Sequence, residues 1–308
     1  MLEVKDYTPR GWTEPQDGEE RSRWYCARLE EGQILFFPQI PFELPEEDRD
    51  FLTGVRQTTA AYHKNISYRP GEGRVRGLER GSADERRLAA ILGAYSERVT
   101  RFASEFLAPY ARGWQLDLAS FRSVEERGRD LPLKSRNDLL HTDAFPTRPT
   151  NGNRILRVFS NLNPTEPRVW LTGEPFHVLA PRWAADAGLD ECVEFARSRW
   201  RPLGRRWRRL AGALGLPVPD RSPYDRFMLG FHDYLKANRA FQESAPKSRR
   251  DFPPHCTWIV FTDAVPHSVL SGRFALEQTY IVSRQDLVLP EKSPLRVLEN
   301  LCGVSLTN

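Results

Sequence analysis

The segment HTDAFP (141–146) contains the clearest candidate for metal chemistry in the chain. His141 and Asp143 are two positions apart, and residues i and i+2 of an extended strand point to the same side. Both side chains can therefore reach one ion. A second histidine from elsewhere would complete a face of two histidines and one carboxylate, which leaves positions open on iron(II) for oxygen chemistry.

The triplet alone is weak evidence for a metal site. The chain has six histidines and 41 acidic residues among its 308, and a His-x-acid triplet arises by chance in roughly half of such chains. The context strengthens it. The run RNDLL leads into His141 and a proline follows Phe145, which indicates the edge between a strand and a loop.

His267 is the histidine best placed to be the third ligand. It follows the strand-like run TWIVFTD and the turn DAVP, and it precedes a second run, SGRFALEQTYIV. We expect two antiparallel strands joined in this way to carry His267 to a position facing His141. Three other histidines are interpreted as packed or surface side chains: His232 in a helical pattern, His255 in a proline turn, and His177 after a strand-like run.

A dicarboxylate cosubstrate would need a cation for its far carboxylate, and arginine binds carboxylates in a bidentate manner. Arg273 lies six residues beyond His267. Arg157 shares one side of a predicted strand with Asn161, and Arg168 opens the next strand. We favour Arg157 and Arg273, with Arg168 close behind, and Asn161 completes the pocket. An exposed arginine on the wall of the sheet is the alternative for each.

The elements that must position these residues are mainly short strands. A strand is expected within 33–41, and further strands at 116–124, 154–162, 168–172, 257–263 and 273–282. Apolar residues at helical spacing predict a long helix over 84–112, with Asp84 as its cap and Gly113 just past its end.

This pattern predicts an α+β protein: a double-stranded β-helix, or jelly-roll, buttressed by helices. We expect a single domain over residues 1–308, with a helical N-terminal part at about 1–115. The β-helix core is expected at about 116–290, with a helical insert at about 180–245. A parallel α/β fold ranks second, because strands and helices alternate too unevenly for it.

Composition narrows the class of protein. The chain is 40% hydrophobic and 28% charged, with a net charge of +4, as in a soluble protein that binds anions. The four cysteines lie far apart, so a cysteine zinc site is not expected. The N-terminus is polar and no run is long enough to span a membrane. We therefore expect a cytoplasmic protein.

Several longer segments resemble the Kdo hydroxylases, iron(II)/2-oxoglutarate oxygenases that act on the Kdo sugar of bacterial lipopolysaccharide. The similar segments are HTDAFP (141–146), RILRVFSNLNP (154–164), YDRFMLGFHDYLKANRAFQ (224–242), WIVFTDAVPH (258–267) and ALEQTYIV (275–282). The resemblance runs from the ILFFP segment to SPLRVLENL, nearly the whole chain.

The resemblance implies hydroxylation of the 3-carbon of Kdo on Kdo-lipid A, which gives the Ko sugar. Iron(II) would be held by His141, Asp143 and His267. The reaction would consume 2-oxoglutarate and O2, release succinate and CO2, and use ascorbate as the reductant in vitro. Neither nucleic acid nor an obligate protein partner is expected.

Kdo-lipid A is anionic, so the resemblance also implies that the protein has basic surfaces that bind it. The segment RSRWRPLGRRWRRL (197–210) combines arginines with Trp200 and Trp207, which suits peripheral binding to the anionic inner face of the inner membrane. An arginine-rich helix face that is simply exposed to solvent is an alternative of equal weight for this segment. Lys134, Arg136 and Arg148 flank the HxD segment and are candidates for contacts to sugar or phosphate, with ordinary surface charges as the alternative.

Two other functions remain open from the residues. The same chemistry would also suit a hydroxylase of a protein side chain or a small molecule. A non-enzymatic basic binding module, in which His141 and His267 only pack, belongs to a different class.

Overall fold

The computed structural model describes residues 1–4, 15–55, 65–198 and 220–307. Its larger sheet has the order β1-β2-β9-β6-β11-β5-β3-β4, and every neighbouring pair is antiparallel except β1 with β2. The strands are β1 (Leu2–Glu3), β2 (Leu35–Phe37), β9 (Thr257–Phe261), β6 (Arg154–Asn161), β11 (Ala275–Val282), β5 (Gln115–Arg122), β3 (Ile66–Arg69) and β4 (Arg74–Arg76). The predicted α+β class is confirmed, and the parallel α/β alternative is wrong.

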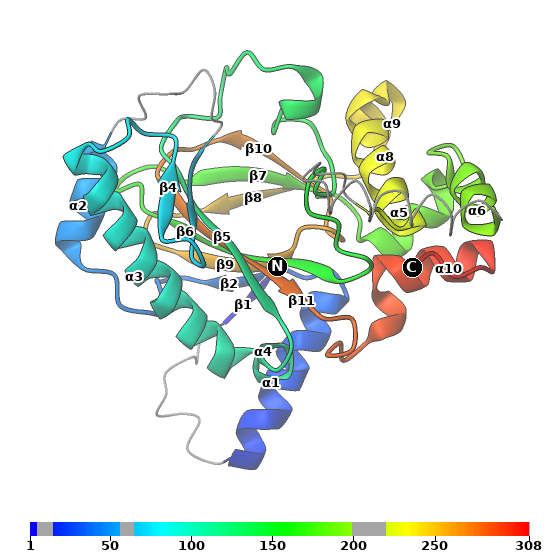
Figure 1. Ribbon diagram of the computed structural model, residues 1–308, viewed down its shortest axis with the longest axis horizontal. Coiled ribbons are helices and arrows are strands. Elements are labelled where there is room, and N and C mark those ends of the chain that lie inside the picture. Colours follow the sequence, from blue (N-terminus) through cyan, green and yellow to red (C-terminus); the bar gives the residue numbers. More distant parts are fainter. Residues whose placement is uncertain (5–14, 56–64, 199–219, 308) are drawn as a thin grey trace, which may run out of the picture.

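A smaller antiparallel sheet lies against the larger one (Figure 1). It contains β10 (His267–Ser271), β7 (Arg168–Thr172) and β8 (Ser248–Phe252), in that order. The outer edge of β10 is extended by one bridge, between His141 and His267. The two predicted histidine ligands are thus neighbours across the edge of this sheet.

The space between the sheets is filled mainly by aromatic rings. Trp258 of β9 stacks on Phe252 of β8, with ring centroids 3.9 Å apart, and on Phe159 of β6 at 5.1 Å. Trp170 of β7 meets Trp258 edge-on at 5.5 Å. Stacked and edge-to-face pairs add to the stabilisation that burial provides. This packing makes the two sheets one rigid support for the residues at their edge.

Helices cover the opposite face of the larger sheet. These are α1 (Pro15–Glu30), α2 (Glu46–Gly54), α3 (Ala83–Phe106) and α4 (Ala108–Ala111). The last helix, α10 (Pro294–Cys302), lies instead beside α5 (Phe176–Trp183) and α6 (Leu189–Arg197). The long helix predicted over 84–112 is two helices, because Leu107 (φ −119°, ψ 46°) interrupts it. Its cap is Ser82, whose hydroxyl accepts a hydrogen bond from the Glu85 amide at 3.1 Å, so the prediction of Asp84 was wrong.

The helices between β7 and β8 form an insert. They are α5 (Phe176–Trp183), α6 (Leu189–Arg197), α8 (Pro223–Ala237) and α9 (Arg239–Ser244). Ser222 and Asp225 make reciprocal capping bonds at the start of α8, with Pro223 in its first turn. Residues 199–219, which include most of the arginine-rich segment 197–210, lie outside the described residues.

The prediction that the two strands on either side of His267 are antiparallel is wrong, because β9 and β11 are each antiparallel to β6 and so run parallel to each other. Strands β9 and β11 are in the same sheet but are separated by β6, and His267 begins a strand of its own, β10, in the other sheet. The sequence HSVLS is too short and polar to be recognised as a strand. None of the helices within the described ranges is long and apolar enough to cross a bilayer.

Candidate metal centre

Backbone hydrogen bonds hold the HxD segment against two strand ends. His141 and His267 exchange amide-to-carbonyl bonds of 3.1 and 2.9 Å, and the Asp143 amide donates to the Thr262 carbonyl at 2.9 Å. Residues 141–143 are therefore bound both to β10 and to the end of β9. The separation of His141 and Asp143 by two residues then places both side chains on the side where His267 projects.

The donor atoms of His141, Asp143 and His267 all lie within 4.8 Å of one another. The His141 Nδ1–H donates to the Leu139 carbonyl at 2.7 Å, and the His267 Nδ1–H donates to the Val265 carbonyl at 3.0 Å. Each ring thereby presents its Nε2 to the cluster, and such outer hydrogen bonds fix the tautomer and the orientation of a metal-binding histidine. The arrangement matches a facial triad of two imidazoles and one carboxylate.

The protonation states also suit a divalent cation. Burial lowers the pKa of both His141 and His267, which leaves the rings neutral near pH 7. Burial alone would raise the pKa of Asp143, but the Arg157 guanidinium, together with His267, His141 and the Thr262 hydroxyl, holds that pKa far below its usual range. A metal ion would thus meet two neutral imidazoles and an ionised carboxylate, the forms in which these groups bind metals.

A chain of alternating charges extends from the cluster into the interior. Arg157 lies 3.0 Å from the Asp143 carboxylate and 2.7 Å from that of Glu277. Glu277 also accepts a 2.9 Å hydrogen bond from Arg122 Nε. Beyond Arg122, the chain continues to Glu126 at 3.8 Å. Nearly every charge in this buried line has an opposite neighbour, as buried charges require.

Arg168 closes this chain. Its guanidinium lies 3.4 Å from Glu126 and donates to the Gly272 carbonyl at 2.9 Å. Gly272 has φ +122°, and a Cβ there would come within 2.9 Å of the Arg168 side chain, so the close approach requires glycine. Burial lowers the pKa of Arg168 to about 10.

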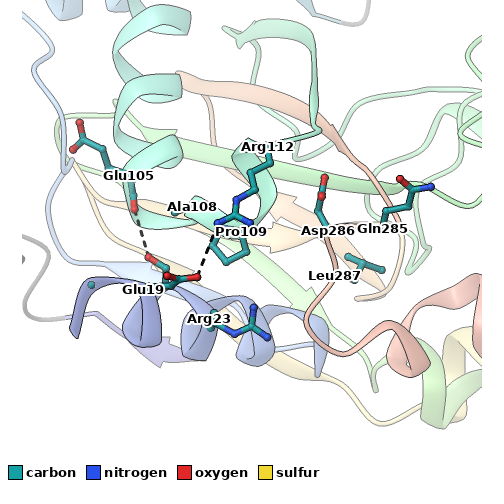
Figure 2. Close-up of a pocket in the computed structure, with 11 residues that line it drawn as sticks. Glu19, Arg23, Glu105, Ala108, Pro109, Arg112, Gln285, Asp286 and Leu287 are labelled. Carbon is teal, nitrogen blue, oxygen red and sulfur yellow. Dashed lines mark hydrogen bonds and ion pairs between the residues drawn. The ribbon is translucent and has the colours of Figure 1, made fainter. Parts of the chain in front are cut away.

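The cluster lines a pocket of about 230 Å³ between the sheets and the helical insert. Its walls are Asn65, Arg122, Lys134, Asn137, His141, Asp143, Arg157, Phe159, Trp170, His232, Lys236, His267 and Val269. A hollow of about 370 Å³ beside α1 and α4 is larger and is lined by Glu19, Arg23, Glu105 and Arg112 among others (Figure 2). No candidate metal cluster within the described residues lies there. The smaller pocket is therefore identified as the functional site by its metal-binding residues and not by its volume.

The four residues predicted to bind a cosubstrate are not brought together. Arg157 lines the pocket, whereas Arg168 is buried behind it against Glu126. The Asn161 amide donates to backbone carbonyls, including that of Phe252 at 3.0 Å, and shapes a loop. Arg273 is exposed, with its guanidinium 4.7 Å from the centre of the Phe274 ring.

The three residues predicted to bind substrate are also separated. Lys134 lines the pocket and pairs with Asp233 at 2.6 Å. Arg136 pairs with Asp138 outside it, and Arg148 stacks on Phe145 at 4.3 Å and pairs with Asp117.

Arg122, His232 and Lys236 line the pocket but were missed in the sequence. His232 and Lys236 stand one turn apart on α8, a spacing that places them on one helix face. That spacing was the only signal for them, because nothing in the sequence indicates that α8 covers the HxD segment. Arg122 and Glu277 meet because β5 pairs with β11, which only the sheet register reveals.

Comparisons with known proteins agree with this geometry. A family model for 3-deoxy-D-manno-oct-2-ulosonic acid (Kdo) hydroxylase matches residues 12–305. Crystal structures of the Kdo hydroxylase KdoO, a non-heme Fe(II) alphaketoglutarate-dependent dioxygenase, are similar. The complex with cobalt(II) has 35% identity and a TM-score of 0.83, covering 100% of this chain and 97% of that one.

Two further KdoO structures contain the reaction's small molecules. The complex with alphaketoglutarate and Fe(III) is 36% identical, with a TM-score of 0.79 and coverage of 94% of this chain and 92% of that one. The complex with succinate and Fe(III) is 34% identical, with a TM-score of 0.81 and coverage of 100% and 97%. No curated protein sequence matched the chain.

Alanine at His141 or His267 should weaken metal binding strongly, because each change removes one of three donors. We expect cobalt(II) affinity, measured by calorimetric titration, to fall by more than the roughly 10- to 100-fold that loss of an outer hydrogen-bond partner causes. His177→Ala, on α5 and outside the pocket, is the matched control and should bind like the wild type. Unchanged affinity in the His141 and His267 variants would show that the cluster does not hold the ion.

Proposed function

Because the chain belongs to the family of Kdo hydroxylases, we propose that it is a non-heme iron(II), 2-oxoglutarate-dependent dioxygenase that hydroxylates Kdo. The observation that carries this proposal is the cluster of His141, Asp143 and His267 in the wall of a charged pocket. The finer assignment, which follows the family resemblance, is hydroxylation of the 3-carbon of Kdo on Kdo-lipid A to give Ko, with release of succinate and CO2.

The arrangement of strands supports a double-stranded β-helix. In the larger sheet β9, β6, β11 and β5 are neighbours, and in the smaller sheet the His141 bridge, β10, β7 and β8 follow one another. Successive strands therefore alternate between the sheets, from β5 to the bridge at His141, then to β6 and β7. A jelly-roll is built by this kind of alternation, and it brings the bridge at His141 beside β10, where His267 lies.

The residues around the cluster have distinct tasks. The three ligands would hold iron(II), which when bound supplies the activation of O2 that is coupled to decarboxylation of the keto acid. Arg157 keeps Asp143 ionised and oriented. The Trp170 ring stacks on His267, with centroids 5.1 Å apart, and Phe159 lines the same wall. These rings exclude water from the side of the pocket between the sheets.

Arg122 is the residue that we assign to the far carboxylate of 2-oxoglutarate. Arg157 directly contacts the ligand Asp143, so it stands at the metal end of the pocket. Arg122 lies one ion pair further along the charge chain and also lines the pocket. Its Nη1 is 3.8 Å from Glu126, too far for a hydrogen bond, so this donor is free to bind an incoming carboxylate.

Arg122→Met should therefore raise the KM for 2-oxoglutarate by about 10-fold or more, the cost of one charge-assisted contact. Because Arg122 does not touch the ligands, cobalt(II) affinity should stay within about twofold. Arg273→Met is the matched control and should leave the KM for 2-oxoglutarate unchanged. A raised KM in the Arg273 variant, with a normal value for Arg122→Met, would reverse the assignment.

Because the proposed substrate is a glycolipid, we expect the enzyme to act at a membrane surface. A glycolipid that carries Kdo is anchored in a bilayer, and the arginine- and tryptophan-rich composition of residues 197–210 supports peripheral contact with anionic lipid. This contact would lie on the cytoplasmic side, where the expected reducing environment also suits iron(II).

Binding to vesicles should show the screening expected for such a contact. We expect co-sedimentation with vesicles that contain 30% anionic lipid at low ionic strength and loss of most binding at about 0.5 M salt, because screening shortens the reach of exposed charges. Vesicles of neutral lipid are the control. Binding that is equal on both vesicles, or indifferent to salt, would remove the membrane role.

Hydroxylation itself is tested by mass spectrometry. Kdo-lipid A incubated with protein, iron(II), 2-oxoglutarate and ascorbate should gain the mass of one oxygen atom, with one succinate formed for each product. His141→Ala should abolish the gain, because the metal loses a ligand. Turnover of 2-oxoglutarate without oxygen gain would favour a protein or small-molecule substrate, and absence of any turnover would favour a binding module.

A further inference from the structure

Lys236 is a buried cation without a partner of opposite charge. Its side chain is 4% exposed, and its Nζ donates one hydrogen bond of 2.9 Å, to the backbone carbonyl of Lys134. Among the described residues no carboxylate lies within ion-pair distance of it. A buried ammonium without a counter-ion is costly, and burial lowers the pKa of Lys236 to about 8.

This lysine is held at a defined place beside the metal ligands. Lys236 lines the pocket, one helical turn from His232. The His232 Nδ1–H donates to the Thr142 carbonyl at 2.8 Å, and its ring centroid lies 4.9 Å from that of His141. Helix α8 is therefore attached to the HxD segment itself, and the hydrogen bond to the Lys134 carbonyl holds the Lys236 ammonium on the same side.

A second attachment comes from α9. The Gln242 side chain accepts a hydrogen bond from the Leu140 amide at 3.0 Å and donates to the Leu140 carbonyl at 2.9 Å. Both backbone groups of the residue before His141 are thus engaged by the insert. The insert and the metal ligands form one unit, so the position of Lys236 relative to the metal is built into the fold.

The pocket consequently has two separate places for an anion. Arg122 projects from β5 in the larger sheet and is paired with Glu277 and near Glu126. Lys236 projects from α8 in the insert, where Asp143, Asp233 and Asp138 attract it only from beyond ion-pair distance and its one described hydrogen bond goes to a backbone carbonyl. One dicarboxylate that binds the metal at its keto-acid end has a single far carboxylate, so it can occupy only one of them.

We propose that Lys236 binds the carboxylate of the sugar acid substrate and so sets which carbon faces the metal. This inference rests on the proposed function. In an ulosonic acid the carboxylate is the first carbon, and the third carbon is two bonds away. A cation next to the metal ligands therefore brings the neighbouring C–H groups toward the metal, whereas a more distant cation would select a carbon further along the chain.

Lys236→Met keeps the length of the side chain and removes its charge. We expect the KM for Kdo-lipid A to rise about 10- to 100-fold, the range for loss of a charge-assisted hydrogen bond. The KM for 2-oxoglutarate and the affinity for cobalt(II) should stay within about twofold of the wild type. Lys292→Met, before α10 and outside the pocket, is the matched control for removal of a lysine. Thermal unfolding of each variant identifies any loss of folded protein.

The methyl ester of the sugar carboxylate provides the decisive comparison. The wild type should prefer the acid to the ester by about the same factor that Lys236→Met loses, and the variant should not discriminate between them. Equal discrimination in both proteins, or a rise in the KM for 2-oxoglutarate alone, would overturn the inference while the hydroxylase activity stands. A wild type that does not hydroxylate Kdo at all would overturn the proposed function and this inference with it.

Discussion

The Arg157 guanidinium is the contact on which the site depends. It lies 3.0 Å from the Asp143 carboxylate and 2.7 Å from that of Glu277. An ionised carboxylate between two buried imidazoles is stable only if a cation offsets the cost of its desolvation. The geometry of the three donors therefore depends on Arg157, and the position of Arg157 depends in turn on Glu277 in the next strand of the larger sheet.

The same requirement explains the charged interior behind the ligands. Glu277, Arg122, Glu126 and Arg168 continue the alternation away from the metal end. Removing one partner of a buried pair typically costs about 3–5 kcal/mol, because the other charge is left uncompensated. These groups therefore hold one another in place between two sheets whose aromatic core is otherwise apolar. A cosubstrate anion meets cations that are already ordered, so little entropy is lost in arranging them.

The residues that line the pocket come from two different parts of the chain. The sheets and the strand ends supply the metal ligands and Arg122, whereas the helical insert between β7 and β8 supplies His232 and Lys236. Hydrogen bonds from His232 and Gln242 attach this insert to the HxD segment. The sheets thus act as the scaffold, and the insert is a separate segment that this scaffold positions over the pocket.

The sequence alone determined the local features. The runs rich in β-branched and aromatic residues predicted β6, β7 and β9, the helical spacing of apolar residues predicted α3, and the HxD pair follows from strand geometry. Strand β10 was missed because its five residues, HSVLS, are too few to show a hydrophobic periodicity. Its pairing with His141 joins segments that are about 125 residues apart in the sequence. Which arginine lies in the pocket, and that α8 covers it, depends on sheet register and helix packing. Those are long-range contacts, and no local pattern encodes them.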